Sequence, residues 1–200
     1  MTEHHTYAHQ IHPVKAHIAE HAHINNEQYL ALYQQSIERP DIFWAEQARQ
    51  FLDWHQPWDK VMDYDYPKGK ISWFSGGKLN VSVNCLDRHL STHGNQVALI
   101  WEGDDPANHK KMTYRELHQE VCQFANVLKS QGVKKGDRVC IYLPMLIEAA
   151  AVILACTRIG AVHSIVFGGF SAEALKDRIN DAEWVLILYN VNYTHTWEPY

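Results

Sequence analysis

The feature that most constrains the fold is an alternation of short apolar runs and longer helical patterns between residues 135 and 188. The runs KGDRVCIYLP, AVHSIVF and WVLIL are typical of strands. Segments 147–160 and 171–183 between them are typical of helices, the second with Ser171 as a candidate N-cap. Strands that alternate with helices at this spacing predict βαβ units with right-handed connections. We therefore expect an α/β fold with an incomplete doubly wound parallel sheet, covered by helices on both faces.

The segment before this alternation predicts one more strand and one more helix. The run QVALIWEG is typical of a strand. The next helix opens with a capping box, Thr113-x-x-Glu116, and Gly132 lies where a C-terminal cap belongs. Five apolar residues form one stripe along this helix: Tyr114, Leu117, Val121, Phe124 and Leu128. We expect residues 96–183 to form the first part of an α/β domain with a βαβαβ arrangement.

Residues 25–95 predict a helical, aromatic-rich region that precedes the sheet. One helix begins near Asn25 and ends before Pro40, because the residue before a proline avoids the α region. A second helix extends from Asp41 to about Leu52. The passage 53–77 contains three Trp and two Tyr residues. We expect irregular chain there, with its aromatic rings packed as a layer on a neighbour.

Residues 1–24 predict a flexible, His-rich arm. Seven of the fourteen histidines lie in the first 23 positions, with few large apolar residues and little periodicity. One alternative is a weak transition-metal site, since His-rich tracts bind metals. No Cys or carboxylate arrangement completes a coordination shell there, so a polar tail is favoured and no metal site is expected.

Composition disfavours several function classes. A net charge of -5 and only two Lys pairs, Lys110-Lys111 and Lys134-Lys135, disfavour a nucleic-acid binder. No apolar run reaches the ~18 residues of a membrane span, and the N-terminus lacks the pattern of a signal peptide. The cysteines lie far apart, which is typical of reduced thiols. We expect a cytoplasmic protein that binds neither nucleic acid nor membrane.

The stretch WFSGGKLNVSVNCLDRHL, residues 73–90, contains two groups that suggest chemistry. Its Gly-Gly-Lys is not a Walker A loop, because the glycines are adjacent and Leu79 occupies the place of the Mg²⁺-binding hydroxyl. Cys85, Asp87 and His89 suggest a nucleophile or metal cluster, but on a helix position 87 points away from the face of the other two. A structural turn and structural packing are therefore favoured, and no catalytic residue is predicted.

The turn VFGGFS, residues 166–171, is the best candidate for a ligand site. It follows a predicted strand and opens a helix, which is where open α/β sheets bind ligands. Gly168 and Gly169 would let a ligand approach the backbone, and the helix N-terminus offers free N–H groups to an anion. A tight turn that simply needs glycine explains the same residues equally well.

Three motifs together resemble one enzyme family. WFSGGKLNVSVNCLDRHL is similar to the N-terminal region of AMP-forming acetyl-CoA synthetases, the acetate–CoA ligases. MTYREL at 112–117 and ILACTRIGAVHSIVFGGFSAEAL at 153–175 resemble the first two core motifs of the acyl-adenylate-forming superfamily. The resemblance implies that a complete enzyme converts acetate, ATP and CoA into acetyl-CoA, AMP and pyrophosphate with the help of Mg²⁺. Related propionyl- and acetoacetyl-CoA synthetases share part of the pattern.

The resemblance carries only one ligand contact onto this sequence. The FGGF turn of the family lies beside the CoA nucleotide, which implies CoA contacts at Phe167, Gly168 and Gly169. The phosphate loop and the C-terminal catalytic Lys of the family match no residue here, which implies a truncated N-terminal portion that is inactive alone. We interpret residues 184–200 as an atypical tail, because the likeness is expected to end at Glu183; a frameshift or gene truncation is one hypothesis.

Three interpretations of function stay open. The first is part of an acetate–CoA ligase, complemented by a separately encoded remainder of a split acetyl- or propionyl-CoA synthetase. The second is a non-catalytic module that binds CoA or a nucleotide. The third is an interaction protein that docks a partner on its aromatic N-terminal layer.

Overall fold

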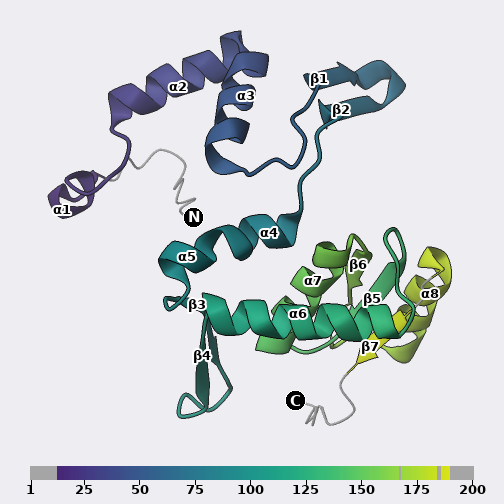
Figure 1. Cartoon of the computed structure of the whole chain (residues 1–200). Helices are drawn as coiled ribbons and strands as arrows, with labels where there is room; N and C mark the ends of the chain where they lie inside the picture. Colours follow the sequence, from purple (N-terminus) through teal and green to yellow (C-terminus); the bar gives the residue numbers. More distant parts are fainter. Residues whose placement is uncertain (1–12, 167, 184–185, 190–200) are drawn as a thin grey trace, which may run out of the picture. The chain divides into compact units, whose positions relative to one another are not determined.

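The computed structural model describes residues 13–166, 168–183 and 186–189 (Figure 1). The chain divides into two compact units. The first comprises Met1–Phe51 and Lys60–Ser75, and the second comprises Leu52–Asp59 and Gly76–Tyr200. The domain boundaries expected after residues 24, 95 and 183 stay predictions.

The described part of the first unit consists of helices followed by a β-hairpin. The predicted helix near Asn25 is confirmed: the Asn25 side chain accepts a hydrogen bond from the N–H of Gln28, and the Gln28 side chain accepts one from the N–H of Asn25. A short helix occupies part of the predicted arm, whose residues 1–12 lie outside the described residues. The elements are α1 (Ala16–Ala19), α2 (Asn26–Glu38), α3 (Pro40–Phe51), β1 (Lys60–Asp65), the 3-10 helix η2 (Tyr66–Lys68) and β2 (Lys70–Ser75).

The expectation of irregular chain in residues 53–77 is wrong for most of that passage. Strands β1 and β2 pair antiparallel, with Met62 opposite Trp73 and Tyr64 opposite Ile71. These positions are two residues apart on each strand, so the apolar and aromatic pairs share one face of the hairpin. Cross-strand pairing of this kind stabilises a regular hairpin, which a count of aromatic residues alone does not reveal.

The parallel sheet of the second unit confirms the predicted α/β fold. Its strands are ordered β6-β5-β7, and both pairings are parallel. Helix α7 leads from β5 to β6, and α8 leads from β6 back past β5 to β7 (Figure 1). Since connections after β5 and β6 run in opposite directions, a crevice forms at the carboxyl ends of these two strands. The elements are β5 (Arg138–Tyr142), α7 (Ile147–Ile159), β6 (Val162–Ile165), α8 (Ala172–Ala182) and β7 (Leu186–Tyr189).

The strand predicted at residues 96–103 is present, but it does not belong to the parallel sheet. It forms an antiparallel pair with a strand that was not predicted. The N–H of Gly103 donates to Asn108 O (2.8 Å), and the N–H of Ala107 donates to Asp105 Oδ1 (2.9 Å), which closes the loop between them. A short loop brings its two ends together at small entropic cost, so the local hairpin forms in place of a longer crossover. The strands are β3 (Val97–Glu102) and β4 (His109–Thr113).

The core of the second unit lies between α6, α7 and the sheet. The predicted stripe of α6 is largely confirmed, since Leu117, Val121 and Leu128 are buried. No residue of α7 is exposed, in agreement with its nearly all-round apolar sequence. None of the described helices combines the length and the apolarity that crossing a membrane requires. The remaining elements are α4 (Val81–Cys85), the 3-10 helix η3 (Asp87–His89), α5 (Leu90–His93) and α6 (Tyr114–Ser130).

The structure confirms the predicted capping box at the start of α6. The N–H of Glu116 donates to Thr113 Oγ1 (3.3 Å), and the N–H of Thr113 donates to the Glu116 carboxylate (2.8 Å). Thr113→Ala should lower the free energy of unfolding by about 1 kcal/mol, because an N–H at the helix start loses its acceptor. Urea denaturation followed by circular dichroism measures the change. Thr113→Ser keeps a hydroxyl acceptor and is the control; equal losses in both variants would contradict the cap.

Candidate functional site

A cavity of about 740 Å³ opens at the carboxyl ends of β5 and β6. Residues from three segments line it: the β3–β4 hairpin at 101–108, the loop after β5 at 143–146, and the turn after β6 at 165–170. This is the switch point of the sheet, where open α/β sheets bind ligands. Its volume lies within the roughly 300–1,000 Å³ of small-molecule pockets. The predicted Gly168 and Gly169 both line this cavity.

Two aromatic side chains fix the walls of the cavity. Trp101 Nε1–H donates to Met145 O (2.6 Å), which joins the hairpin to the loop after β5. The Tyr142 hydroxyl lies 3.0 Å from Gly168 O and 3.1 Å from Phe170 O. It has one proton and therefore donates to one of these carbonyls at a time. Neither aromatic residue was singled out in the sequence, because an aromatic residue at a strand end belongs to no motif.

The protein leaves room for a side chain at Gly168. A Cβ placed there would approach Leu143 O and backbone atoms of Pro144 at 3.8 Å, which is ordinary van der Waals contact. Packing within the chain therefore does not require glycine at this position. Of the two interpretations of the turn, this favours close approach of a ligand. Phe167, the third predicted contact, lies outside the described residues.

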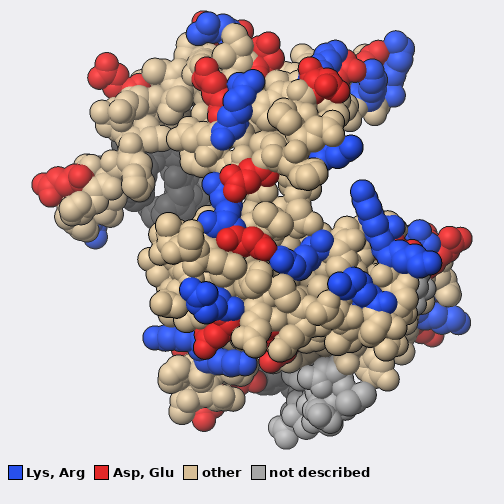
Figure 2. All heavy atoms as spheres, in the orientation of Figure 1, with Lys and Arg blue, Asp and Glu red and all other residues tan. Residues whose placement is uncertain are grey.

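The lining of the cavity is acidic. It includes Glu102, Asp104 and Asp105, and among the described residues that line it there is no Lys or Arg. The guanidinium of Arg178 on α8 lies 4.8 Å from the centre of the Phe170 ring, in a cation–π contact at the cavity rim. On the face that Figure 2 shows, Lys and Arg side chains are interspersed with Asp and Glu. An anionic ligand of this cavity would need cations from beyond the lining.

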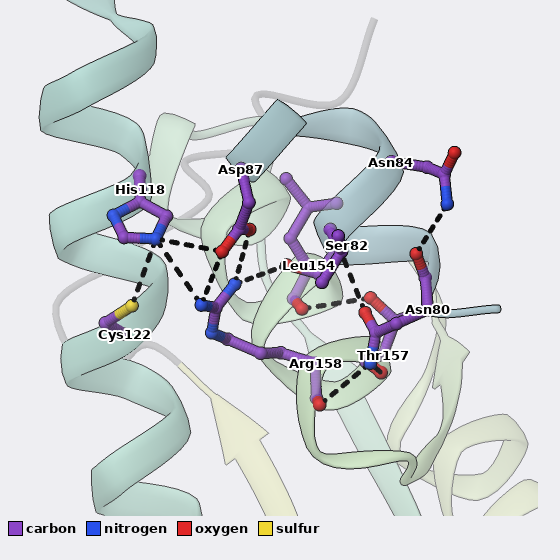
Figure 3. Close-up of polar contacts among 10 residues, drawn as sticks. Asn80, Ser82, Asn84, Asp87, His118, Cys122, Leu154, Thr157 and Arg158 are labelled. Carbon is purple, nitrogen blue, oxygen red and sulfur yellow. Dashed lines mark hydrogen bonds and ion pairs between the residues drawn. The ribbon is translucent and has the colours of Figure 1, made fainter. Parts of the chain in front are cut away.

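The stretch at residues 73–90, which carries part of the family resemblance, is joined to α7 by an ion pair (Figure 3). Arg158 Nη1 and Nη2 donate to Asp87 Oδ2 and Oδ1 at 2.7 and 2.8 Å. The two side chains are 24% and 27% exposed. The hydrogen bonds from Arg158 hold the pKa of Asp87 below its ordinary value, against the opposing effect of desolvation. Arg158 Nη1 also donates to Ser82 Oγ (3.4 Å), which is fully buried.

Asn80 connects the same stretch to the end of α7. Its Nδ2 donates to Thr157 O (3.2 Å) and Arg158 O (3.0 Å), two carbonyls of the last helical turn, and Thr157 O also accepts from the N–H of the cap residue Gly160 (3.2 Å). Its Oδ1 accepts a hydrogen bond from Val83 N–H (3.2 Å) and so caps α4 as well. One asparagine thus ends one helix and begins another, which gives the stretch a scaffolding role.

Asp87 does not form a cluster with Cys85 and His89. Cys85 is exposed, and His89 packs near the rings of His93 and Tyr114 at 6.1 and 5.7 Å. The chain leaves the α-helical path between α4 and η3, so the three side chains do not lie on one regular helix.

His118 instead lies between Asp87 and a different thiol. His118 Nε2 is 3.4 Å from Asp87 Oδ1 and 3.7 Å from Cys122 Sγ (Figure 3). A nucleophile relay uses both ring nitrogens, one toward the thiol and one toward the carboxylate. Here a single nitrogen faces both groups, so this arrangement is a structural network of α6, α7 and η3.

Among the residues that the structure describes, no group of three or more His, Cys, Asp or Glu side chains is placed to hold a metal ion. Four histidines of the predicted arm, His4, His5, His9 and His12, lie outside those residues.

Two protein-family models match the chain. The model described as acetyl-coenzyme A synthetase N-terminus matches residues 29–85, and the model described as AMP-binding enzyme matches residues 86–198. Because the second match covers more than half of the sequence, the chain belongs to the family of AMP-binding enzymes. This match continues beyond Glu183, so the expectation that the likeness ends there is wrong. The atypical character of residues 184–200 stays a prediction.

Curated relatives are named acetyl-coenzyme A synthetase. The chain is 61% identical to the one from Saccharophagus degradans over 178 residues, which are 89% of this chain and 28% of the relative. It is 58% identical to the one from Vibrio cholerae over 180 residues, again 89% and 28%. An acetoacetyl-CoA synthetase structure from Streptomyces lividans matches with a TM-score of 0.74 and 30% identity, over 87% of this chain and 27% of that one. The chain resembles the N-terminal portion of these proteins and spans about 28% of the length of the curated relatives.

The Asp87–Arg158 pair predicts a pH-dependent share of stability. The pKa of Asp87 is lower in the folded chain than in the unfolded chain, where it is about 3.9. The ion pair therefore makes its full contribution to the free energy of unfolding at pH values above about 3.9. This contribution is lost as the pH falls through the lower folded value. Asp87→Asn should therefore reduce the free energy of unfolding by about 2 kcal/mol near pH 7, and by progressively less below about pH 4.

Urea denaturation of the parent chain and of Asp87→Asn, near neutral pH and near pH ~3, measures this difference. Asp104→Asn removes an exposed hairpin carboxylate and is the matched control, which should change stability little at either pH. A loss for Asp87→Asn that is as large in acid as at neutral pH would contradict the ion pair.

Proposed function

We propose that this chain forms the wall that faces coenzyme A in an acetate–CoA ligase. The complete enzyme would convert acetate, ATP and CoA into acetyl-CoA, AMP and pyrophosphate with the help of Mg²⁺. The observation that carries the proposal is the cavity between the ends of β5 and β6, into which the backbone of Gly168 and Gly169 opens. The names of the relatives, acetyl-coenzyme A synthetases, support the choice of reaction.

In this proposal, the residues of the chain bind and orient CoA. Gly168 and Gly169, with Phe167, would contact the CoA nucleotide, because a residue without a Cβ lets a flat group lie against the backbone. Tyr142 holds the carbonyls of this turn, so that less conformational freedom is lost on binding. Trp101 fixes the loop on the opposite wall through Met145.

Acidic residues in the lining predict that the chain alone binds CoA weakly. Glu102, Asp104 and Asp105 repel the phosphate groups of CoA, and the lining offers no described Lys or Arg to neutralise them. The proposal therefore assigns the phosphate-neutralising cations, the ATP and Mg²⁺ sites and the catalytic groups to the remainder of the enzyme. That remainder is either part of the same polypeptide or separately encoded.

A second candidate function is a non-catalytic module that binds CoA or a nucleotide. It is favoured by one observation: every residue that lines the cavity belongs to the second unit of this chain. Such a module would bind the same ligand without acetyl transfer, so activity with the remainder of the enzyme distinguishes the two functions.

The proposed CoA site predicts the effect of two substitutions. Gly168→Ala should weaken CoA binding about fivefold or more, because the methyl group occupies space for the ligand, and should leave the unfolding midpoint nearly unchanged since its Cβ has room. Tyr142→Phe should weaken binding about threefold to tenfold by releasing the turn carbonyls. Calorimetry and NMR titration with CoA measure both. Tyr189→Phe, at the exposed end of β7, is the matched control; an equal effect there would contradict the proposed role of Tyr142.

Acetyl-adenylate formation tests the ligase assignment. The 200-residue chain alone should produce no acetyl hydroxamate above background from acetate, ATP, Mg²⁺ and hydroxylamine. Adding a polypeptide that comprises the remainder of the Saccharophagus degradans relative should produce it, and that remainder alone is the control. Turnover by the chain alone would contradict the proposal. CoA binding without any rescue of turnover would favour the binding module.

A further inference from the structure

A second cavity, of about 730 Å³, contains positive charge. It shares no lining residue with the cavity at Gly168. Lys78 and Lys135 both line it, and Lys78 is the lysine of the Gly-Gly-Lys motif, which the proposed function does not use. Across residues 13–166, 168–183 and 186–189, the structure gives neither lysine side chain an ion pair.

The backbone of Lys78 is held firmly in place. The N–H of Lys78 donates to Gln56 O (2.9 Å), and Lys78 O accepts from His55 N–H (2.8 Å) and from Gln56 N–H (3.0 Å). The turn before it requires glycine: Gly76 has a φ of 81°, and a Cβ there would collide with the Asp59 carboxylate. The motif is therefore a structural turn that presents Lys78 at a fixed point of the cavity wall.

Lys135 is positioned by the end of α7. Gly160 caps this helix with a φ of 76°, and a Cβ at Gly160 would lie only 3.0 Å from Lys135 Cγ. The alkyl stem of Lys135 thus packs over the bare backbone of the cap. The N–H of Gly136 donates to Gly160 O (2.9 Å), which ties the lysine-bearing loop to the helix end. A lysine whose stem is already packed loses less freedom when its ammonium group binds a ligand.

The acidic residue of the lining, Asp53, does not neutralise these lysines. Its carboxylate lies 3.5 Å from Arg88 Nε. Asn84 fixes the Asp53 backbone, with Oδ1 accepting from Asp53 N–H (2.8 Å) and Nδ2 donating to Asp53 O (3.0 Å). Two lysine charges therefore remain without a carboxylate partner in a concave site.

The rest of the wall combines apolar side chains and an indole ring with the polar side chains of His55 and Asn80. Trp54, Leu79 and Val83 line the cavity. Trp54 is half-buried and makes an edge-to-face contact with Trp58, with ring centres 4.9 Å apart at 66°. A fixed indole ring beside two cations is a surface that matches a flat group joined to an anion.

We propose that this cavity binds a small organic phosphate with a flat apolar group. The phosphate would lie between Lys78 and Lys135, and the flat group would lie against Trp54. A phosphate monoester carries nearly two negative charges at neutral pH, which two lysines match. The site goes beyond the proposed ligase function and does not rest on it, because the two cavities have no residue in common.

Phenyl phosphate is the smallest probe that has both parts, and inorganic phosphate and phenol supply each part alone. Titration of the ¹⁵N-labelled chain, followed at the Gly77 amide and the Trp54 indole N–H, should show that phenyl phosphate binds at least about tenfold tighter than either part. Trp54→Phe assigns the indole resonance. Raising the ionic strength from about 0.01 to 0.15 M should weaken binding, because the Debye length falls from about 30 to about 8 Å.

Lys78→Gln and Lys135→Met should each weaken phenyl phosphate binding about tenfold, and Lys78→Arg should preserve it. Lys134→Gln removes the neighbouring lysine, which is outside the lining, and should have no effect. No resonance shift at millimolar phenyl phosphate, an equal loss in Lys134→Gln, or phenol binding as tightly as phenyl phosphate would each overturn the proposal. Shifts at Gly168 and Gly169 in place of Gly77 and Trp54 would also overturn it.

Discussion

Strand β5 lies in the middle of the parallel sheet, and the arrangement around it follows from that position. Val139, Cys140 and Ile141 have no exposed surface, and burial raises the pKa of the Cys140 thiol to about 11. Because β6 and β7 pair with opposite edges of β5, the chain leaves β5 in one direction and returns past it in the other. That reversal separates the loops after β5 and β6 and leaves a crevice between them. The cavity beside Gly168 is therefore a consequence of strand order.

A second constraint determines where α7 ends. The Asn80 side chain donates hydrogen bonds to two carbonyls in the last turn of α7, and Asp87 forms an ion pair with Arg158 of the same turn. Gly160 follows directly, and β6 then pairs with β5 in a register that sets Val162 beside Arg138. A half-buried ion pair adds modest net stability but favours one geometry over others. The stretch that carries the family resemblance thus contributes no chemistry of its own, and it supports the site through the position of α7.

Local signals predicted most of the helices and the three parallel strands, because caps and periodicity depend on residues close in sequence. The hairpins were not predicted, since a strand such as β3 chooses between partners that its own sequence does not specify. The sequence of α2 also does not predict how much of the helix is buried. Tyr33 and Ile37 recur at helical spacing, yet both side chains are more than half exposed. At the site, the glycine turn was recognised, but Tyr142 lies 26 residues before Gly168 and only the fold brings them together. The Asp87–Arg158 pair spans 71 residues and was equally hidden.

The cavity at Gly168 and the cavity at Lys78 differ in charge, and this difference limits what each can recognise. The wall of Glu102, Asp104 and Asp105 gives a phosphate no favourable interaction, so in the proposed ligase it selects an uncharged portion of CoA and leaves the phosphates to cations elsewhere. The wall of Lys78 and Lys135 attracts phosphate and offers a flat ring beside it. Charge therefore favours a small organic phosphate at the cavity of Lys78 and Lys135, whereas the cavity at Gly168 becomes a strong site for CoA only when cations in addition to Arg178 are brought to it.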